Sequence, residues 1–87
     1  MTELEEAIES ICGPDDMPLK ADGFDEAIIG MSLNNLSLIY DHEKIITILM
    51  ARDGMTREEA YEFFDYNILG AYVGDRTPIL LRDINSA

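Results

Sequence analysis

The chain has 87 residues, with 18 Asp and Glu against 6 Lys and Arg, which gives a formal net charge of −12. Residues 1–26 contain nine acidic residues and one base, a net of −8, whereas residues 27–87 contain nine acidic residues and five bases, a net of −4. A surface of this sign repels nucleic-acid phosphate and attracts basic molecules. The composition therefore argues against direct binding of DNA or RNA.

Length and residue usage predict one folded domain, residues 1–87. An apolar content of 47% argues against disorder, and a chain of this size buries a modest core. The single cysteine, Cys12, excludes an intramolecular disulfide and is typical of a reducing compartment. The acidic start does not resemble a secretory signal, and no apolar run approaches the ~18 residues of a membrane span. We expect a cytoplasmic protein that does not contact membranes.

A short acidic helix is predicted over residues 2–12. Thr2 and Glu5 form a capping box, and Gly13-Pro14 ends the helix. Its apolar stripe, spaced i, i+3, i+4, i+7 and i+8, consists of Leu4, Ala7, Ile8, Ile11 and Cys12. Its opposite face carries Glu3, Glu6 and Glu9.

The next part of the chain predicts a loop followed by a hairpin. Residues 13–25 contain two prolines and two glycines without a hydrophobic period, so we expect a loop, and the most mobile segment of the chain. Residues 26–31 are predicted to form a buried strand and residues 37–40 a second strand. Asn34-Asn35 is a turn signal between them.

Two helices and a final strand are predicted in the C-terminal half. Asp41 is expected to cap the first helix, and Gly54 to end it. Thr56 and Glu59 form the capping box of the second helix, and Gly70 is expected to end that helix. The residues of the second helix expected to face inward are Ala60, Phe63, Phe64 and Ile68. After a turn over 74–78, residues 79–81 form the last strand, and 82–87 a frayed tail.

The predicted order of elements is α-β-β-α-α-β, in an α+β domain with its core over residues 26–81. We expect a short antiparallel sheet of about three strands with the helices packed on one face.

The sequence resembles several familiar functional motifs but lacks residues that each of them needs. The two helices around Gly54 resemble a helix-turn-helix, but the second carries four acidic residues and only Arg57, so DNA phosphate would be repelled. An EF-hand loop with Gly23 at its sixth position would place Pro18 and Lys20 at ligand positions. His42 is the only histidine and has no paired ligand. No catalytic constellation is recognisable, so we expect neither an enzyme nor a bound metal or cofactor.

A second group of residues lies at the predicted ends of elements, where binding groups often occur. These ligand-binding candidates are Tyr40, Asn67, Tyr72, Arg76 and Thr77. Each also has a structural explanation, as amphipathic packing, a helix end or a turn.

Residues 22–81 resemble an uncharacterised family of small acidic proteins encoded by phages and bacterial prophages. The resemblance rests on DGFDEAIIG at 22–30, Tyr40-Asp41 opening a helix, DGMTREEA at 53–60, Asn67, and GAYVG at 70–74 followed by Thr77-Pro78. The family brings no assigned activity. It implies a phage-type product working in bacterial cytoplasm, with the acidic first helix as an addition to the common core.

Charge and resemblance together favour a non-catalytic protein that binds, and inhibits, a basic host protein by presenting carboxylates as nucleic acid presents phosphates. The residues expected to contact this partner are Glu3, Glu6, Glu9, Asp15, Asp16, Asp22 and Asp25. One alternative is a small-ligand or nucleotide-binding oligomer, with sites near the candidates given above. Another is a structural role, in which the acidic surface serves only solubility.

Overall fold

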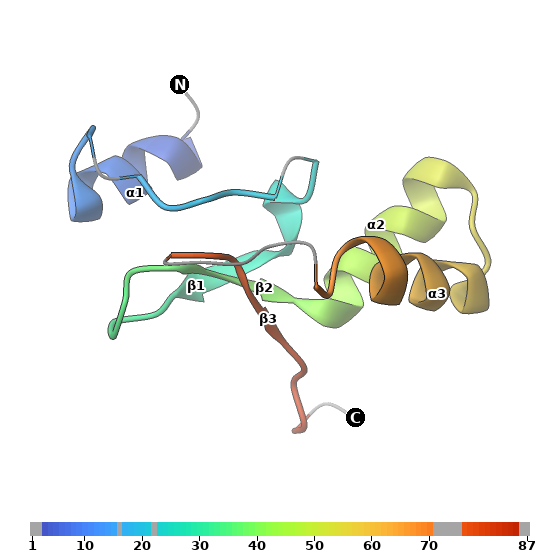
Figure 1. Cartoon of the computed structure of the whole chain (residues 1–87). Coiled ribbons are helices and arrows are strands. Elements are labelled where there is room, and N and C mark those ends of the chain that lie inside the picture. Colours follow the sequence, from blue (N-terminus) through green and yellow to red (C-terminus); the bar gives the residue numbers. More distant parts are fainter. Residues whose placement is uncertain (1–2, 16, 22, 71–75, 86–87) are drawn as a thin grey trace.

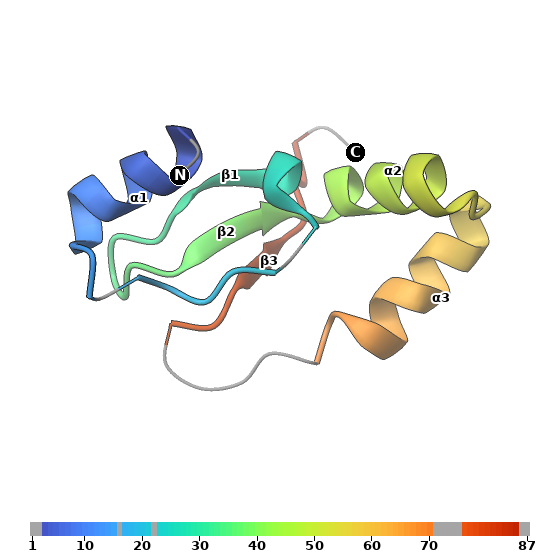
Figure 2. The ribbon, with the colours of Figure 1, turned by 90° about the horizontal axis from the view of Figure 1, so that it is seen from above.

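The computed structural model describes residues 3–15, 17–21, 23–70 and 76–85. It contains three α-helices, one short 3₁₀ helix and three strands: α1 (Glu3–Cys12), η1 (Asp25–Ala27), β1 (Ile28–Met31), β2 (Leu38–Asp41), α2 (His42–Asp53), α3 (Arg57–Asn67) and β3 (Ile79–Leu81). The protein is elongated, 39 × 25 × 25 Å. Helix α1 lies at one end and α2 with α3 at the other, with the sheet between them (Figures 1 and 2). The α+β class is confirmed.

The hairpin is confirmed, within a mixed sheet. Strands β1 and β2 pair antiparallel, with Ile28 opposite Tyr40 and Met31 opposite Leu38, and a bulge falls at Ile29. The predicted buried strand over 26–31 is wrong in two respects. Its first two residues belong to η1, and Ile29 is 46% exposed because β1 is an edge strand.

The last strand runs parallel to β2, so the prediction of a wholly antiparallel sheet is wrong. Ile39 lies opposite Ile79, and Asp41 opposite Leu81. Strand β2 leads directly into α2, and α3 packs back against α2. Residues 68–78 can then span up to about 36 Å, which is enough to return the chain to the start of β2. Such a return makes β3 run in the same direction as β2.

Capping residues set the helix ends largely as predicted. The Asp41 carboxylate accepts a hydrogen bond from the Lys44 amide at 3.0 Å, and Gly54 closes α2 in the left-handed conformation. Both hydrogen bonds of the capping box are present: the Thr56 amide donates to the Glu59 carboxylate, and the Glu59 amide donates to the Thr56 hydroxyl. Helix α3 ends at Asn67, before the predicted Gly70. The proposed box at Thr2 lies outside the described residues.

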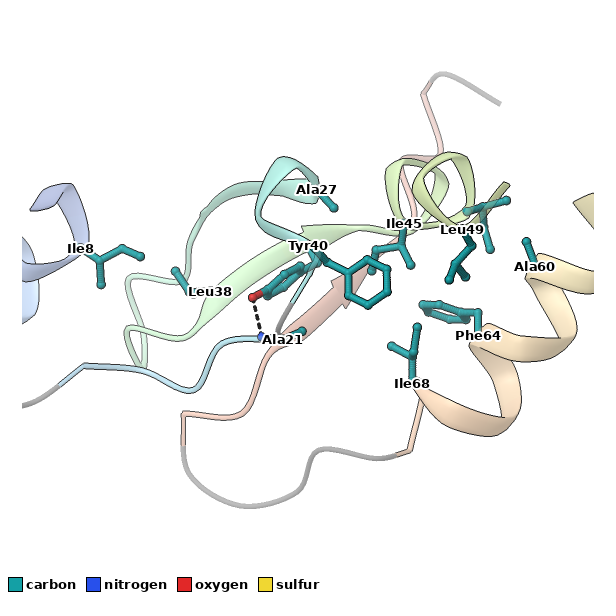
Figure 3. Packing of buried hydrophobic residues seen from close by; sticks show 12 residues of the cluster. Ile8, Ala21, Ala27, Leu38, Tyr40, Ile45, Leu49, Ala60, Phe64 and Ile68 are labelled. Atoms are coloured by element: carbon teal, nitrogen blue, oxygen red, sulfur yellow. Dashed lines mark hydrogen bonds between the residues drawn. The ribbon is translucent and has the colours of Figure 1, made fainter. Parts of the chain in front are cut away.

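The core follows the long axis of the molecule (Figure 3). Ile8 of α1 and Leu38 lie toward one end, and Ala60, Phe64 and Ile68 pack against α2 at the other. Four of these five residues are predicted from the sequence to face inward, and the fifth, Leu38, is predicted only to lie in a strand. Burial of these apolar groups is the main stabilising contribution.

Tyr40 joins the loop before η1 to the sheet. Its side chain is fully buried, and its hydroxyl accepts a hydrogen bond from the Ala21 amide at 2.8 Å (Figure 3). Ala21 and Phe24 of the same loop are also core residues. This part of the predicted loop is therefore anchored by packing, although it has no hydrophobic period.

Replacing Tyr40 with Phe should reduce the free energy of unfolding by about 1–3 kcal/mol, because the buried Ala21 amide loses its acceptor. Urea denaturation measures this difference. The matched control is Tyr66→Phe, since Tyr66 is 88% exposed and should tolerate the same change without effect. Equal unfolding free energies for the two variants would contradict this role of Tyr40.

Candidate partner-binding surface

The acidic face of α1 is the feature of the predicted surface that the structure displays most clearly. Glu3 and Glu6 are exposed, and Glu9 is half-buried, one turn further along the same helix. No lysine or arginine occurs on α1, and the three carboxylates have no cationic partner among the described residues. Asp15 follows as an exposed residue just beyond the helix.

Asp25 differs from these four carboxylates because it is already paired. Lys20 Nζ lies 3.2 Å from Asp25 Oδ2 and 3.9 Å from Glu5 Oε1. Lys20 is the only base in residues 1–26, and through these two contacts it links η1 to α1. Asp16 and Asp22, also predicted to contact a partner, lie outside the described residues.

An apolar groove lies between α1 and the edge strand β1, on the side of the helix that faces away from Glu6 and Glu9. Its volume is about 330 Å³, and its lining comes from four residues of α1, the four residues of β1, and Leu38. Ile8 and Leu38 are buried at this groove, whereas Ile11 is 61% exposed and Ile29 is 46% exposed. The predicted stripe on the first helix is therefore only partly covered by the core. Sequence reasoning missed the groove because it assigned both isoleucines to buried faces.

A second acidic row lies on α3, the helix whose acidic residues argue against DNA binding. Glu58, Glu62 and Asp65 are exposed and spaced i, i+4 and i+7, so they share one face of the helix. This spacing was visible in the sequence. Because α1 and α3 lie at opposite ends of the molecule (Figures 1 and 2), the acidic residues form at least two separate faces.

The ligand-binding candidates are placed on separate elements. Tyr40 is buried in the core, and Asn67 is exposed at the end of α3, where its amide donates to the Phe63 carbonyl at 3.2 Å. Arg76 Nη2 lies 3.3 Å from both Cys12 Sγ and the Leu36 carbonyl oxygen. Thr77, next to Arg76, is half-buried. Asn67 therefore lies at the end of the molecule formed by α2 and α3, whereas the Arg76 side chain contacts α1 at the other end. Tyr72 lies outside the described residues.

A larger cavity of about 610 Å³ lies between η1 and α2. Three of its four charged residues, Lys20, Asp25 and Arg52, are engaged with other protein groups. Arg52 forms two hydrogen bonds to Asp53, at 3.2 and 3.1 Å, and these raise the pKa of its guanidinium. The same guanidinium donates to the Gly23 carbonyl at 3.3 Å and lies 5.0 Å from the Phe24 ring. These contacts fasten the loop before η1 to α2.

The backbone conformation at this contact favours glycine at position 23. Its φ of +88° is in the left-handed region, and an added Cβ would lie 2.7 Å from Arg52 Nη1. The glycine of the DGFDEAIIG motif thus has a structural explanation.

A polar cluster connects the start of α2 with α3. Glu43 accepts hydrogen bonds from Arg57 at 2.9 Å and from the Tyr61 hydroxyl at 2.8 Å. The pKa of Glu43 is lowered from its ordinary 4.5, chiefly by the hydrogen bond from Tyr61 and also by Arg57. The His42 ring packs on Phe64 with centroids 4.4 Å apart. Among the described residues, no three His, Cys, Asp or Glu side chains converge to hold a metal ion.

Glu43 should make the free energy of unfolding depend on pH. Its lowered native pKa means that its contribution is present above pH 4.5 and is lost as the pH falls through the native value. Because the Glu43 side chain is 48% exposed, we expect Glu43→Gln to cost less than about 1 kcal/mol near neutral pH and nothing below the native pKa.

Urea denaturation from pH 7 to pH 3 measures this dependence. Glu62→Gln is the matched control, since Glu62 has no hydrogen-bond or ionic partner among the described residues. A constant difference between the Glu43 variant and the parent protein across this range would contradict the linkage.

Comparisons of the chain with protein-family models, curated proteins and solved structures find no match. The resemblance to phage proteins therefore stays a prediction. In the described part of the chain, no helix has the length and apolar character needed to cross a bilayer.

Proposed function

We propose that this is a non-catalytic binding protein that docks on the basic surface of a host protein and blocks it. The observation that carries the proposal is the face of α1, where Glu3, Glu6 and Glu9 gather without a neighbouring cation in the described structure. A cationic surface could contact these carboxylates without first displacing an internal ion pair. Asp15 extends the same acidic region past the end of the helix.

Charges of this kind act mainly on association rate and salt dependence. Exposed carboxylates steer a basic partner during diffusional encounter, and the attraction weakens as the Debye length falls. The complex should therefore form quickly at low ionic strength and dissociate in high salt. Glu3 and Glu6 also face the positive end of the α1 dipole, which stabilises the helix itself. The two roles are compatible, because the carboxylates remain exposed.

The α1 face is a better candidate than the α3 face. Helix α3 carries Arg57, whose side chain is engaged with Glu43 and Tyr61 within the helical pair. Helix α1 has no base, so Glu3, Glu6 and Glu9 meet no cation on their own helix. A phage-type protein acting in bacterial cytoplasm is the setting that we propose for this binding.

Removing the α1 charges should abolish capture of basic partners. The full chain, immobilised and exposed to bacterial lysate at about 50 mM salt, is expected to retain one or more proteins with basic surfaces and to release them at about 500 mM. The triple variant Glu3→Gln, Glu6→Gln, Glu9→Gln should lose at least about tenfold in affinity for each purified partner.

The matched control removes the same charge from the other end of the molecule, with Glu58→Gln, Glu62→Gln and Asp65→Asn. Both triple variants have a net charge of −9, so a general charge effect would weaken them equally. Equal losses, or no salt-sensitive basic partner at all, would overturn the proposal.

A further inference from the structure

The outward face of α3 carries an exposed aromatic side chain among its carboxylates. Glu58, Glu62 and Asp65 share this face. Tyr66 is 88% exposed and follows Glu62 by four residues, so the two side chains are neighbours on the helix surface. Leu69, in the turn directly after the helix, is 53% exposed. Helix α1 contains no aromatic residue, so α3 alone offers carboxylates and an exposed ring on one face.

The charge of this face selects a cationic occupant. The three carboxylates have no ionic or hydrogen-bond partner among the described residues. Arg57, the only base on α3, is engaged with Glu43 and Tyr61. Because the carboxylates themselves form the surface, they attract a basic group that comes into contact with it and repel an acidic one.

A second copy of the chain is a poor occupant of this face. Two α3 faces brought together about a two-fold axis would oppose like charges, and α1 is also acidic. Of the six bases of the chain, only Lys44 and Arg82 have no side-chain partner among the described residues. They lie on separate elements, α2 and the segment after β3, so a second copy has no run of bases to match the acidic row.

Tyr66 distinguishes arginine from lysine. The planar guanidinium of arginine stacks on an aromatic face and donates two hydrogen bonds to one carboxylate, whereas the lysine ammonium is a compact, strongly hydrated charge. Tyr66 provides the ring, and Glu62 beside it provides the carboxylate. This pair of neighbours is therefore complementary to a guanidinium in both shape and charge.

We propose that the outward face of α3 binds an arginine-bearing segment of a basic partner protein, with one guanidinium stacked on Tyr66 and paired with Glu62. This docking surface is separate from the acidic face of α1, and the exposed ring gives it a preference for arginine. Exposed ion pairs and a single ring make a weak contact, about millimolar for a short peptide. It is therefore measured by NMR rather than by retention on a column.

Two synthetic peptides of equal charge test the proposal on the full chain: Arg-Ala-Ala-Ala-Arg-Ala-Ala-Arg and its counterpart with lysine in place of arginine. Their bases have the spacing of Glu58, Glu62 and Asp65. Titrations followed by the amide resonances of α3 should show the arginine peptide binding at least about threefold more tightly. The amide resonances of α1 are the internal reference, since both peptides should bind there equally.

Variants of Tyr66 locate the preference. Tyr66→Ala should bring the arginine peptide to within about 1.5-fold of the lysine peptide at α3, because only the ring contact is lost. Tyr66→Phe is the matched control, since it keeps the ring and should keep the preference. The side chain is exposed enough for the fold to persist in both variants, which thermal melting checks.

Carboxylate variants test the other half of the contact. Glu62→Gln combined with Asp65→Asn should weaken both peptides at α3 by about threefold or more and leave their binding to α1 unchanged. Unaltered binding of both peptides at α3 would overturn the inference.

The remaining outcomes separate this inference from the proposed function. Equal binding of the two peptides at α3, or an arginine preference that survives Tyr66→Ala, would refute the α3 surface and leave the acidic face of α1 untouched. An arginine preference at α3 with no shift on α1 would support this inference and count against the α1 face. Sedimentation showing a dimer that Tyr66→Ala disperses would make a second copy the occupant and overturn the inference.

Discussion

The anchoring of the loop before η1 by Tyr40 is the interaction on which the arrangement of this small domain depends. A fully buried tyrosine must satisfy its hydroxyl, and here the Ala21 amide supplies the hydrogen bond. The same contact lets Ala21 and Phe24 complete the core beside the sheet. With the loop held in this way, η1 can lie against α2, and Arg52 can reach the Gly23 carbonyl.

The domain also shows how a very acidic chain tolerates its charge. Many carboxylates near the sheet and α2 have structural roles: Asp41 caps α2, Glu43 joins it to α3, and Asp53 pairs with Arg52. Among the described residues, most of the carboxylates that lack such partners lie on outward faces of α1 and α3, at the two ends of the long axis. Distance and solvent between those ends reduce their mutual repulsion.

Local signals predicted most of the elements, because the caps and apolar periods are contained within a few residues. Asp41, Gly54 and the box of Thr56 with Glu59 mark helix ends that the structure confirms. Strand direction was not predictable in this way, since it depends on the path of residues 68–78 rather than on the apolar residues of β3. Burial of Ile29 was misjudged for a similar reason, because an edge position is a property of the assembled sheet.

The candidate surface was predictable only in part. Helical spacing placed Glu3, Glu6 and Glu9 on one face. The contacts of Lys20 with Asp25 of η1 and Glu5 of α1 depend instead on the tertiary fold. The groove likewise requires α1 to lie against β1, a contact that no local pattern encodes.

The contact between Arg76 and Cys12 joins residues 64 positions apart in the chain. During synthesis the acidic helix emerges before Arg76, so this attachment has to wait until Arg76 has left the ribosome. Closing so long a loop is entropically expensive, so it is expected among the later steps of folding. The helix that we assign to partner binding is thus held at its C-terminal end by a residue that is made after all three helices.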